Sequence, residues 1–228
     1  MAGGIKDTPP VRCPRNGFAL QCRATVNTPS SPTFPVARWL ALVWLGVSFP
    51  IYYVWWGPQN FLYFCHIGVF LATLGVWRGS PLLISAAAVC ALAVNVVWCS
   101  DVAWRLLTGA HLLGGTEFMF DAQYPVALRM MSLFHVFSPP VLIWALRHTG
   151  YDPRGLWFQS GLAVSVMIAS RLVRPDLNIN FAHADPLFKT QWGPAPLHVA
   201  AMIVGLIVVI YLPTHWALKR WMPPAKQS

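Results

Sequence analysis

Charge is what this sequence has least of. Only 10% of its 228 residues are charged and 56% are hydrophobic, whereas an ordinary soluble domain carries roughly 25% charged residues. A soluble chain of this length must present much polar surface to water, so the deficit excludes an ordinary soluble globular protein. Lipid is the alternative solvent. The twelve tryptophans agree with it, because indole rings favour the membrane–water boundary.

Patterned cysteines are also lacking. The five cysteines form no CxxC pair and their number is odd, so neither a zinc knuckle nor a disulfide framework is indicated. The first 35 residues hold no long apolar segment of the signal-peptide kind, and their Pro, Ser, Thr and Arg content predicts a poorly ordered tail. Internal repeats and low-complexity tracts are absent as well, which favours a single domain.

Long apolar stretches, in contrast, are plentiful. A helix needs about 17 to 25 residues to cross a hydrocarbon core of about 30 Å, and six stretches qualify. They are Trp39–Trp56, Phe61–Trp77, Pro81–Trp98 with a continuation to Leu107, Tyr124–Leu146, Leu156–Val173 and Pro194–Leu212. The sequence therefore predicts an all-α integral membrane protein: a bundle of six transmembrane helices at residues 39–212, a poorly ordered basic cytoplasmic tail at 1–38 and a short basic cytoplasmic tail at 213–228.

The basic residues predict the orientation of this bundle. With the N-terminus inside, eleven Lys and Arg residues fall on the inner side and four on the outer side, and Arg129 lies within a span. Cytoplasmic loops retain Lys and Arg, so both termini are expected in the cytoplasm. The same rule explains the net charge of +9 better than nucleic-acid binding does. The expected location is a cell membrane.

Polar residues gather at one depth in this topology. Ionisable side chains inside a bilayer are costly unless they meet a partner or a wet cavity, and at about 1.5 Å per helical residue most of them fall in the outer half. These residues are Cys65, His66, Asn95, Asp101, Arg129, His135, Arg171 and His198. They predict a polar pocket that opens to the outer face, covered by loops 109–123 and 174–192, which add Asp121, Asn178 and Asn180. We expect His66, Arg129, Asn178, Asn180, His198 and Asp121 to bind substrate.

Each group also has a plainer structural reading. His66 could be a hydrogen-bonded core histidine, and Arg129 could pair with Asp101 or Asp121 to lock helices together. Asp101 and Arg105, at i and i+4, could form a helix-surface contact. A buried cysteine is most often an inert small hydrophobe.

The chemistry that these residues could perform is thiol-based acyl transfer. A thiolate formed beside an imidazole attacks acyl carbonyls, and an arginine can stabilise an oxyanion or hold a phosphate. Neighbours on a helix point about 100° apart, so His66 is expected to be a poor base for Cys65, and His135 or His198 the better one. Pro139 and Pro140 should kink the fourth stretch just after His135.

Metal chemistry has weaker support. His66, His135, His183 and His198 with outer carboxylates could supply ligands, but no HxxxH or HxxE spacing is present, and CxxCH is absent. No metal site is predicted, and the cofactor is left open.

Several motifs carry a family resemblance. They are Gly115-Thr116-Glu117-Phe118-Met119-Phe120-Asp121, Ser132-Leu133-Phe134-His135, Gly150-Tyr151-Asp152, Asn178-Ile179-Asn180 and Pro213-Thr214-His215. This set resembles a group of uncharacterised bacterial multi-pass membrane proteins over most of residues 57–218. More remotely, the order of features is similar to the YwaF-type membrane family, which is related to a mammalian acyltransferase acting on ether phospholipids.

The remote resemblance implies roles for two residues. The YwaF-type family has a His/Cys motif in an early helix, a Phe-His motif in a middle helix and an asparagine-rich loop before the last helix. By that resemblance Cys65 is the nucleophile and His135 the catalytic histidine. The chain has Phe-Cys-His-Ile where the family has a His-Leu-Cys order.

The leading hypothesis is thus a lipid-modifying enzyme with acyl-transfer or hydrolase-like chemistry. Its pocket is intramembrane and outer-facing, and its partners are the lipid bilayer and a lipid or amphipathic substrate. Two alternatives stay open: a small-molecule carrier or binding protein, and a structural or assembly subunit without catalysis. The oligomeric state is not indicated.

Overall fold

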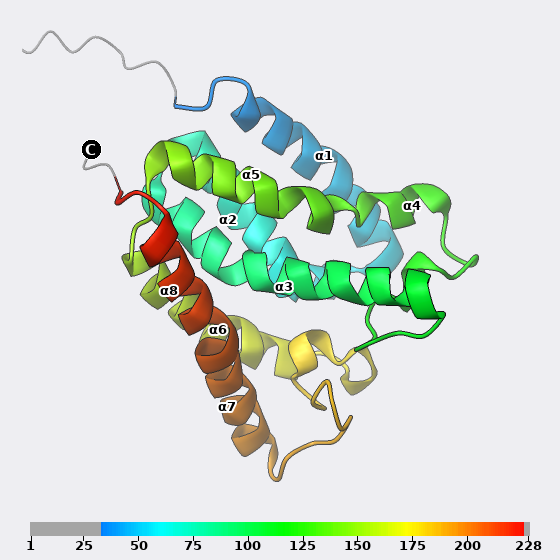
Figure 1. The fold of residues 1–228 in the computed structure, drawn as a ribbon. Coiled ribbons are helices and arrows are strands. Elements are labelled where there is room, and N and C mark those ends of the chain that lie inside the picture. Colours follow the sequence, from blue (N-terminus) through cyan, green and yellow to red (C-terminus); the bar gives the residue numbers. More distant parts are fainter. Residues whose placement is uncertain (1–32, 226–228) are drawn as a thin grey trace, which may run out of the picture. The chain divides into compact units, whose positions relative to one another are not determined.

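The computed structural model describes residues 33–225, and every regular element among them is helical. The helices are α1 (Ala37–Trp56), α2 (Phe64–Arg78), α3 (Pro81–Thr108), α4 (Val126–Met131), α5 (Phe134–Thr149), α6 (Arg154–Arg171), α7 (Ala195–Gly205) and α8 (Leu212–Trp221) (Figure 1). A π-helical stretch, Leu206–Tyr211, joins α7 to α8, and short 3-10 turns lie at Pro58–Leu62, Glu117–Met119, Pro175–Leu177 and Ile179–Phe181. The predicted disordered tail falls largely outside the described residues, as do Cys13 and Cys22.

Four helical segments in the described part are long and apolar enough to cross a membrane. They are Ala37–Trp56, Pro81–Thr108, Val126–Thr149 and Ala195–Trp221. The apolar helix α2 has 15 residues, fewer than a span requires by itself, and the 18-residue α6 is not among the four. The all-helical class is confirmed and is consistent with an integral membrane protein, while the count of six spans stays a prediction.

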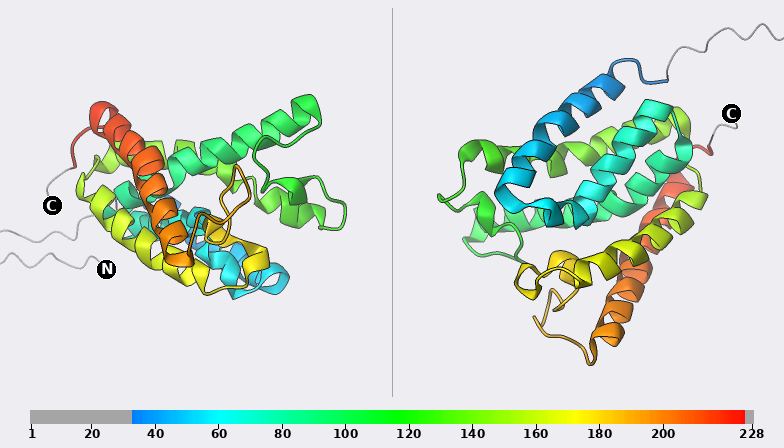
Figure 2. Two further views of the ribbon diagram at one scale, coloured as in Figure 1. Left: turned by 90° about the horizontal axis from the view of Figure 1, so that it is seen from below. Right: turned by 180° about the vertical axis from the view of Figure 1, so that it is seen from behind.

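Helix α3 is central to the bundle, with α2, α5 and α6 packed on it (Figures 1 and 2). Its first half is built from small residues, and Ser85 to Ala88 are completely buried. Glycines of the neighbouring helices face it: a Cβ on Gly75 of α2 would lie 2.9 Å from the Ile84 nitrogen, and one on Gly155 of α6 would lie 2.9 Å from the Ala86 nitrogen. Helices in lipid associate through such close packing of small residues.

The fourth predicted span is interrupted. Ser132 and Leu133 separate α4 from α5, and i to i+3 hydrogen bonds replace the α-helical ones there, as from the His135 nitrogen to the Ser132 oxygen at 3.2 Å. The break therefore precedes His135, whereas the sequence placed a kink after it. Pro139 lacks the N–H that would bind the His135 carbonyl, and the Cys99 thiol donates to that carbonyl instead, at 3.6 Å.

The last helix extends beyond its predicted end at residue 212. Pro213 does not stop it, and α8 continues to Trp221. The proline ring crowds the carbonyl four residues earlier, that of Val209, which lies in the π-helical stretch. The wider π turn accommodates this crowding.

Candidate functional site

Cys65 and His66 stand together in the first turn of α2. The Cys65 Sγ lies 3.7 Å from the His66 Nδ1, a contact that the 100° separation of neighbours on a helix did not predict. Because the helix begins at Phe64, the imidazole turns alongside the thiol at the helix terminus.

The start of α2 is fixed by a residue far away in the sequence. The side chain of Asn180 accepts a hydrogen bond from the Phe64 nitrogen at 3.2 Å and donates to the Leu62 oxygen at 2.7 Å. From the other side, the Cys90 thiol donates to the Phe64 carbonyl at 3.3 Å. The backbone next to Cys65 is therefore held from two directions.

Aromatic rings enclose the His66 imidazole. Its centroid lies 5.0 Å from that of Tyr52, 5.9 Å from that of Phe61 and 5.8 Å from that of Phe134. The histidine is 8% exposed, and its Nε2 has no hydrogen-bond partner among residues 33–225. This enclosure makes the imidazole a buried group with one unused nitrogen.

His135 lies in the same neighbourhood. Phe134, which contacts the His66 ring, also packs on the His135 ring at 4.0 Å, and Trp98 stacks on His135 at 4.4 Å. The His135 Nδ1 lies 2.8 Å from the Ser132 carbonyl. A carbonyl only accepts, so Nδ1 carries the proton and Nε2 is left as the basic nitrogen. The structure thus places Cys65 against His66 on α2, and Phe134 of α5 lies between the His66 and His135 rings.

Asn178 lies elsewhere, in the second long loop (residues 172–194), and His198 lies just after this loop, in α7. The His198 ring is completely buried; its Nδ1 accepts from the Trp192 nitrogen and its Nε2 donates to the Phe181 oxygen, both at 3.1 Å. The Asn178 oxygen accepts from the nitrogens of His183 and Ala184. Both side chains hold the loop in shape, and their roles in substrate binding stay predictions.

Arg129 and Asp121 belong to the segment around the first long loop, residues 109–125. Arg129 donates to the Met119 carbonyl at 3.2 Å, and Asp121 accepts from the Gln123 nitrogen at 2.9 Å. The alternative that Arg129 pairs with Asp101 or Asp121 does not hold in the described part, because neither carboxylate forms an ion pair with it. Ion pairs in the described part join Asp101 to His111, Asp152 to Arg154 and Asp176 to Arg174.

Asp101 has a role that the sequence did not reveal. Its carboxylate, 1% exposed, accepts from the nitrogens of Leu112 and Leu113 at 2.7 Å, and also from the Thr116 hydroxyl. It therefore closes the first long loop from the end of α3. These partners lie 11 to 15 residues downstream, in a segment without periodicity, so spacing could not reveal them. Arg105, which could have contacted Asp101 at i and i+4, lies over the Phe120 ring instead, at 5.6 Å from its centroid.

The second long loop is closed by Asp185 in a similar way. Its carboxylate accepts from the nitrogens of Phe188 at 2.7 Å, Leu187 at 2.9 Å and Thr190 at 3.1 Å. Burial raises the pKa of the Asp185 carboxyl, but these N–H groups favour the charged form, and the net pKa is lowered. The two loops also touch each other, since the Lys189 ammonium donates to the Leu113 carbonyl at 3.3 Å.

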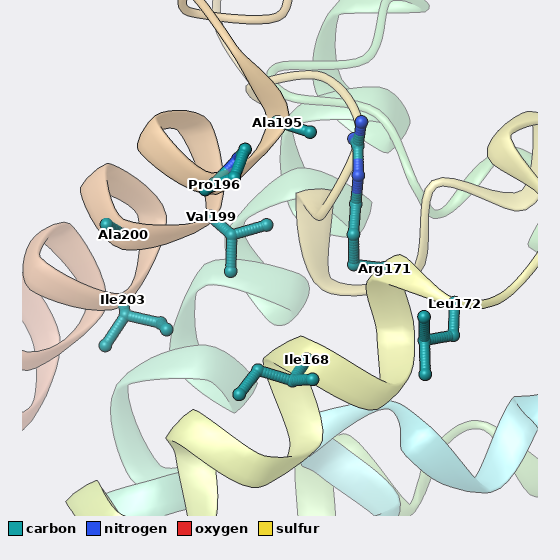
Figure 3. A pocket seen from close by; sticks show the side chains of 8 residues that line it. All are labelled: Ile168, Arg171, Leu172, Ala195, Pro196, Val199, Ala200 and Ile203. Carbon is teal, nitrogen blue, oxygen red and sulfur yellow. The ribbon is translucent and has the colours of Figure 1, made fainter.

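An apolar groove of about 370 Å³ runs between α6 and α7 (Figure 3). Its lining residues are Ile168, Arg171, Leu172, Ala195, Pro196, Val199, Ala200 and Ile203. Arg171 is the one charged residue among them, and its guanidinium donates to the Ala182 carbonyl and to the Gln191 side chain. Asn180 connects this region to the start of α2, next to Cys65. Its side chain donates to the hydroxyl of Ser170, the neighbour of Arg171, at 3.0 Å and accepts from the Phe64 nitrogen.

In residues 33–225 no three His, Cys, Asp or Glu side chains gather in an arrangement that could hold a metal ion. Comparison of the chain with protein-family models, with curated protein sequences and with solved structures gives no match. The geometry of the site is therefore the basis for inferring a function.

Proposed function

We propose that this protein is a six-span membrane enzyme that transfers or hydrolyses an acyl group of a lipid, with Cys65 as its nucleophile. The observation that carries the proposal is the 3.7 Å contact between the Cys65 sulfur and the His66 Nδ1, in a buried aromatic enclosure that also holds His135. A thiol becomes a good nucleophile when a neighbouring base takes its proton.

The proposed reaction assigns a role to each group. The His66 Nδ1 takes the thiol proton, and the thiolate attacks the ester carbonyl carbon, forming a C–S bond. The ester C–O bond then breaks, and the leaving alcohol receives the proton back from the imidazolium. His135, with its Nε2 free to accept, activates the acceptor alcohol or water that takes the acyl group from sulfur and restores the thiol.

A lipid substrate is supported by the surroundings of the site. The α6–α7 groove has the size of a ligand site, and its walls match an acyl chain. Arg171 at the groove has the charge to attract a phosphate headgroup. Asn180 bonds to Ser170 on α6 and to the start of α2, which relates the groove to the thiol.

Six spans with both termini in the cytoplasm fit the distribution of charge. The turn Pro58–Leu62 continues into α2, so that residues 58–78 together reach the length that a span requires. Basic side chains lie at the helix ends that meet near the Tyr151–Pro224 bridge, which we call the basic end. In the described part it comprises Arg38, Arg78, Arg147, Arg154, Lys219 and Arg220. On the positive-inside rule this end faces the cytoplasm.

The test is untargeted lipid analysis of a deletion strain complemented with variants. Wild type should restore the lipid profile, and Cys65→Ala and His135→Ala should not, although both remain folded in the membrane. Cys13→Ala, a change at a cysteine outside residues 33–225, serves as the matched control and should restore it. A lipid profile that the deletion leaves unchanged, or one that Cys65→Ala restores fully, would contradict the proposal.

A structural or assembly role is the second candidate, because many polar side chains are satisfied by backbone groups. His198, Asn178 and Asp101 all close loops in this way. On this reading Cys65→Ala has no effect on lipids, and His198→Ala releases a partner protein that co-purifies with wild type.

A further inference from the structure

Three buried side chains around the candidate site lack hydrogen-bond partners. The Tyr52 hydroxyl, the Asn60 amide nitrogen and the His66 Nε2 have no partner at good hydrogen-bond geometry among residues 33–225; the nearest polar groups are the Ser132 side chain beside Tyr52 and the Asn60 backbone beside His66. Tyr52 is 2% exposed and Asn60 7%. A buried polar atom without a partner is costly, and native structures contain few of them. Three of the eight such atoms in residues 33–225 belong to residues on or next to the ring cluster around His66, where a ligand atom could serve them.

These three groups share one region and one chemical character. The Tyr52 ring packs against the His66 ring at 5.0 Å, and Phe61, the residue after Asn60, packs against it at 5.9 Å. An amide nitrogen only donates, a phenol readily donates, and the His66 Nε2 carries the proton when Nδ1 accepts from the thiol. Their absent partner is therefore an acceptor, such as the oxygen of a carbonyl or an oxyanion.

Tyr52 is held firmly in this position. Its ring stacks on that of Trp56 at 5.3 Å and packs on the His66 ring in a T-shaped arrangement, with an interplanar angle of 81°. Tyr52 and Cys65 thus flank the same imidazole, one against its ring and the other against its Nδ1. A donor fixed in advance stabilises developing charge without reorganisation.

We propose that the Tyr52 hydroxyl and the Asn60 amide form the site that binds the carbonyl oxygen of the acyl group during its transfer to Cys65. The inference rests on the proposed function. As the thiolate forms its bond to the carbonyl carbon, the π electrons of the carbonyl move to the oxygen, and the two donors hold that oxyanion. When the electrons return, the bond to the leaving alcohol breaks and the thioester remains.

The experiment uses the purified full-length protein in detergent micelles with p-nitrophenyl octanoate. Acylation of Cys65 releases p-nitrophenolate in a burst, and mass spectrometry locates the octanoyl group. Removing one oxyanion donor costs about 10²–10³ in rate, so Tyr52→Phe should slow the burst by about that factor. Tyr53→Phe is the matched control, since Tyr53 is the next residue and is 57% exposed; it should acylate as wild type does. Asn60→Leu should also slow acylation.

Alkylation by iodoacetamide separates this role from a structural one. It forms an S–C bond with loss of iodide and develops no oxyanion, so Tyr52→Phe should be alkylated at Cys65 at the wild-type rate. Equal slowing of acylation and alkylation would overturn the inference, and so would unchanged acylation in Tyr52→Phe. Unchanged acylation leaves the proposed function standing, whereas a wild-type protein that forms no thioester at Cys65 overturns both.

Discussion

At the scale of single residues, the polar groups divide into two kinds. Asp101, Asp185 and His198 have their oxygens or nitrogens occupied by backbone groups, and each closes a loop. His66 and Tyr52 keep an unused polar atom in a buried place. A buried polar atom without a partner is expensive, so the second kind marks where a ligand is expected.

Gly150 is the residue whose substitution should cost most stability. Its φ is +82°, and a Cβ there would lie 2.6 Å from the Ala225 Cα and in direct collision with the Pro224 carbonyl. The Tyr151 nitrogen donates to the Pro223 oxygen at 2.7 Å. The collision would therefore also displace residues 223–225, which we call the strap. With ψ at 165°, Gly150 lies in a backbone region essentially restricted to glycine, so Gly150→Ala should destabilise by about 1–3 kcal/mol from the backbone alone and by about 1–3 kcal/mol more from overpacking.

Gly109→Ala is the matched control for Gly150→Ala. Its φ is +78° and its ψ −1°, and a Cβ there meets nothing within 4 Å, so it carries only the smaller cost of a left-handed backbone, about 1–2 kcal/mol, and no collision. Thermal unfolding in detergent should show a clearly lower Tm for Gly150→Ala than for Gly109→Ala. Equal Tm values for the two variants would mean that the strap adds no stability.

The sequence predicted residue types at the site better than their contacts. The sequence predicts Cys65 and His135 as candidates, but it does not predict the contact between the Cys65 and His66 side chains. A 100° separation holds in the middle of a helix and is a poor guide at its first turn, where a flexible side chain can turn back along the terminus. Tyr52 and Asn60 were missed altogether, since an aromatic residue in an apolar stretch predicts packing, and only the three-dimensional structure shows that its hydroxyl lacks a partner.

At the scale of helices, hydropathy predicted the elements, and proline gave misleading boundaries. The end of α1 at Trp56 and the continuation of α3 to Thr108 agree with the sequence, because a glycine with positive φ follows each helix. The break between α4 and α5 and the extension through Pro213 do not. The break lies at Ser132 and Leu133, where no proline stands, and the last helix continues through Pro213 where the π-helical stretch accommodates its ring, so proline positions predict neither boundary.

Close packing of α6 on α3 gives a prediction about Gly155. A Cβ at this position would lie 2.8 to 3.0 Å from Ser85 and from the Ala86 backbone, and a backbone cannot move aside as a side chain can. Gly155→Ala should therefore destabilise by about 1–3 kcal/mol. Gly46→Ala in α1, where a Cβ meets nothing within 4 Å, should be neutral or stabilising because alanine favours helix.

Unfolding in mixed detergent micelles would compare the two variants with wild type. The expected order of stability is Gly46→Ala at or above wild type, with Gly155→Ala below both. If Gly155→Ala were as stable as Gly46→Ala, the two helices would have room to separate without cost.

The second long loop should be sensitive to acid through Asp185. The pKa of this carboxyl is lowered in the folded protein, so its contribution to stability is complete above the ordinary aspartate pKa of about 3.9 and is lost as the pH falls below that value through the lowered pKa. Hydrogen exchange of residues 185–190 should therefore accelerate on acidification below about pH 4, beyond the change in intrinsic exchange rate.

Variants of two aspartates test this dependence. Asp185→Asn should leave the loop less protected at neutral pH and remove the acid-dependent step. Asp176→Asn is the control, because Asp176 and its partner Arg174 are largely exposed and exposed pairs contribute little. An acid-dependent step that persists in Asp185→Asn would assign it to a different group.

At the scale of the whole molecule, sidedness is the property to establish. The basic end holds most of the Lys and Arg residues in the described part. The first long loop follows α3 and the second follows α6, at the ends of these helices that lie away from the basic end. Arg38 also lies over the rings of Trp39 and Trp77, at 5.5 and 5.3 Å, as expected of an anchor at the membrane–water boundary.

Labelling of single added cysteines would determine the sidedness. A membrane-impermeant thiol reagent should label Glu117→Cys in intact cells, since the first long loop is expected outside. It should label Arg220→Cys only after the cells are permeabilised. The protein without an added cysteine gives the background, and the reverse pattern of labelling would invert the proposed topology.

Asn180 has a consequence for biosynthesis. Its side chain caps the start of α2 from 116 residues further along the chain, so the residues beside Cys65 receive this hydrogen bond only after the second long loop has been made. At about 5–20 residues per second, synthesis of that interval takes roughly 6 to 23 seconds. The nascent protein would thus enter the membrane with its thiol present but not yet fixed in place, and chemical competence would arrive only with the nearly complete chain.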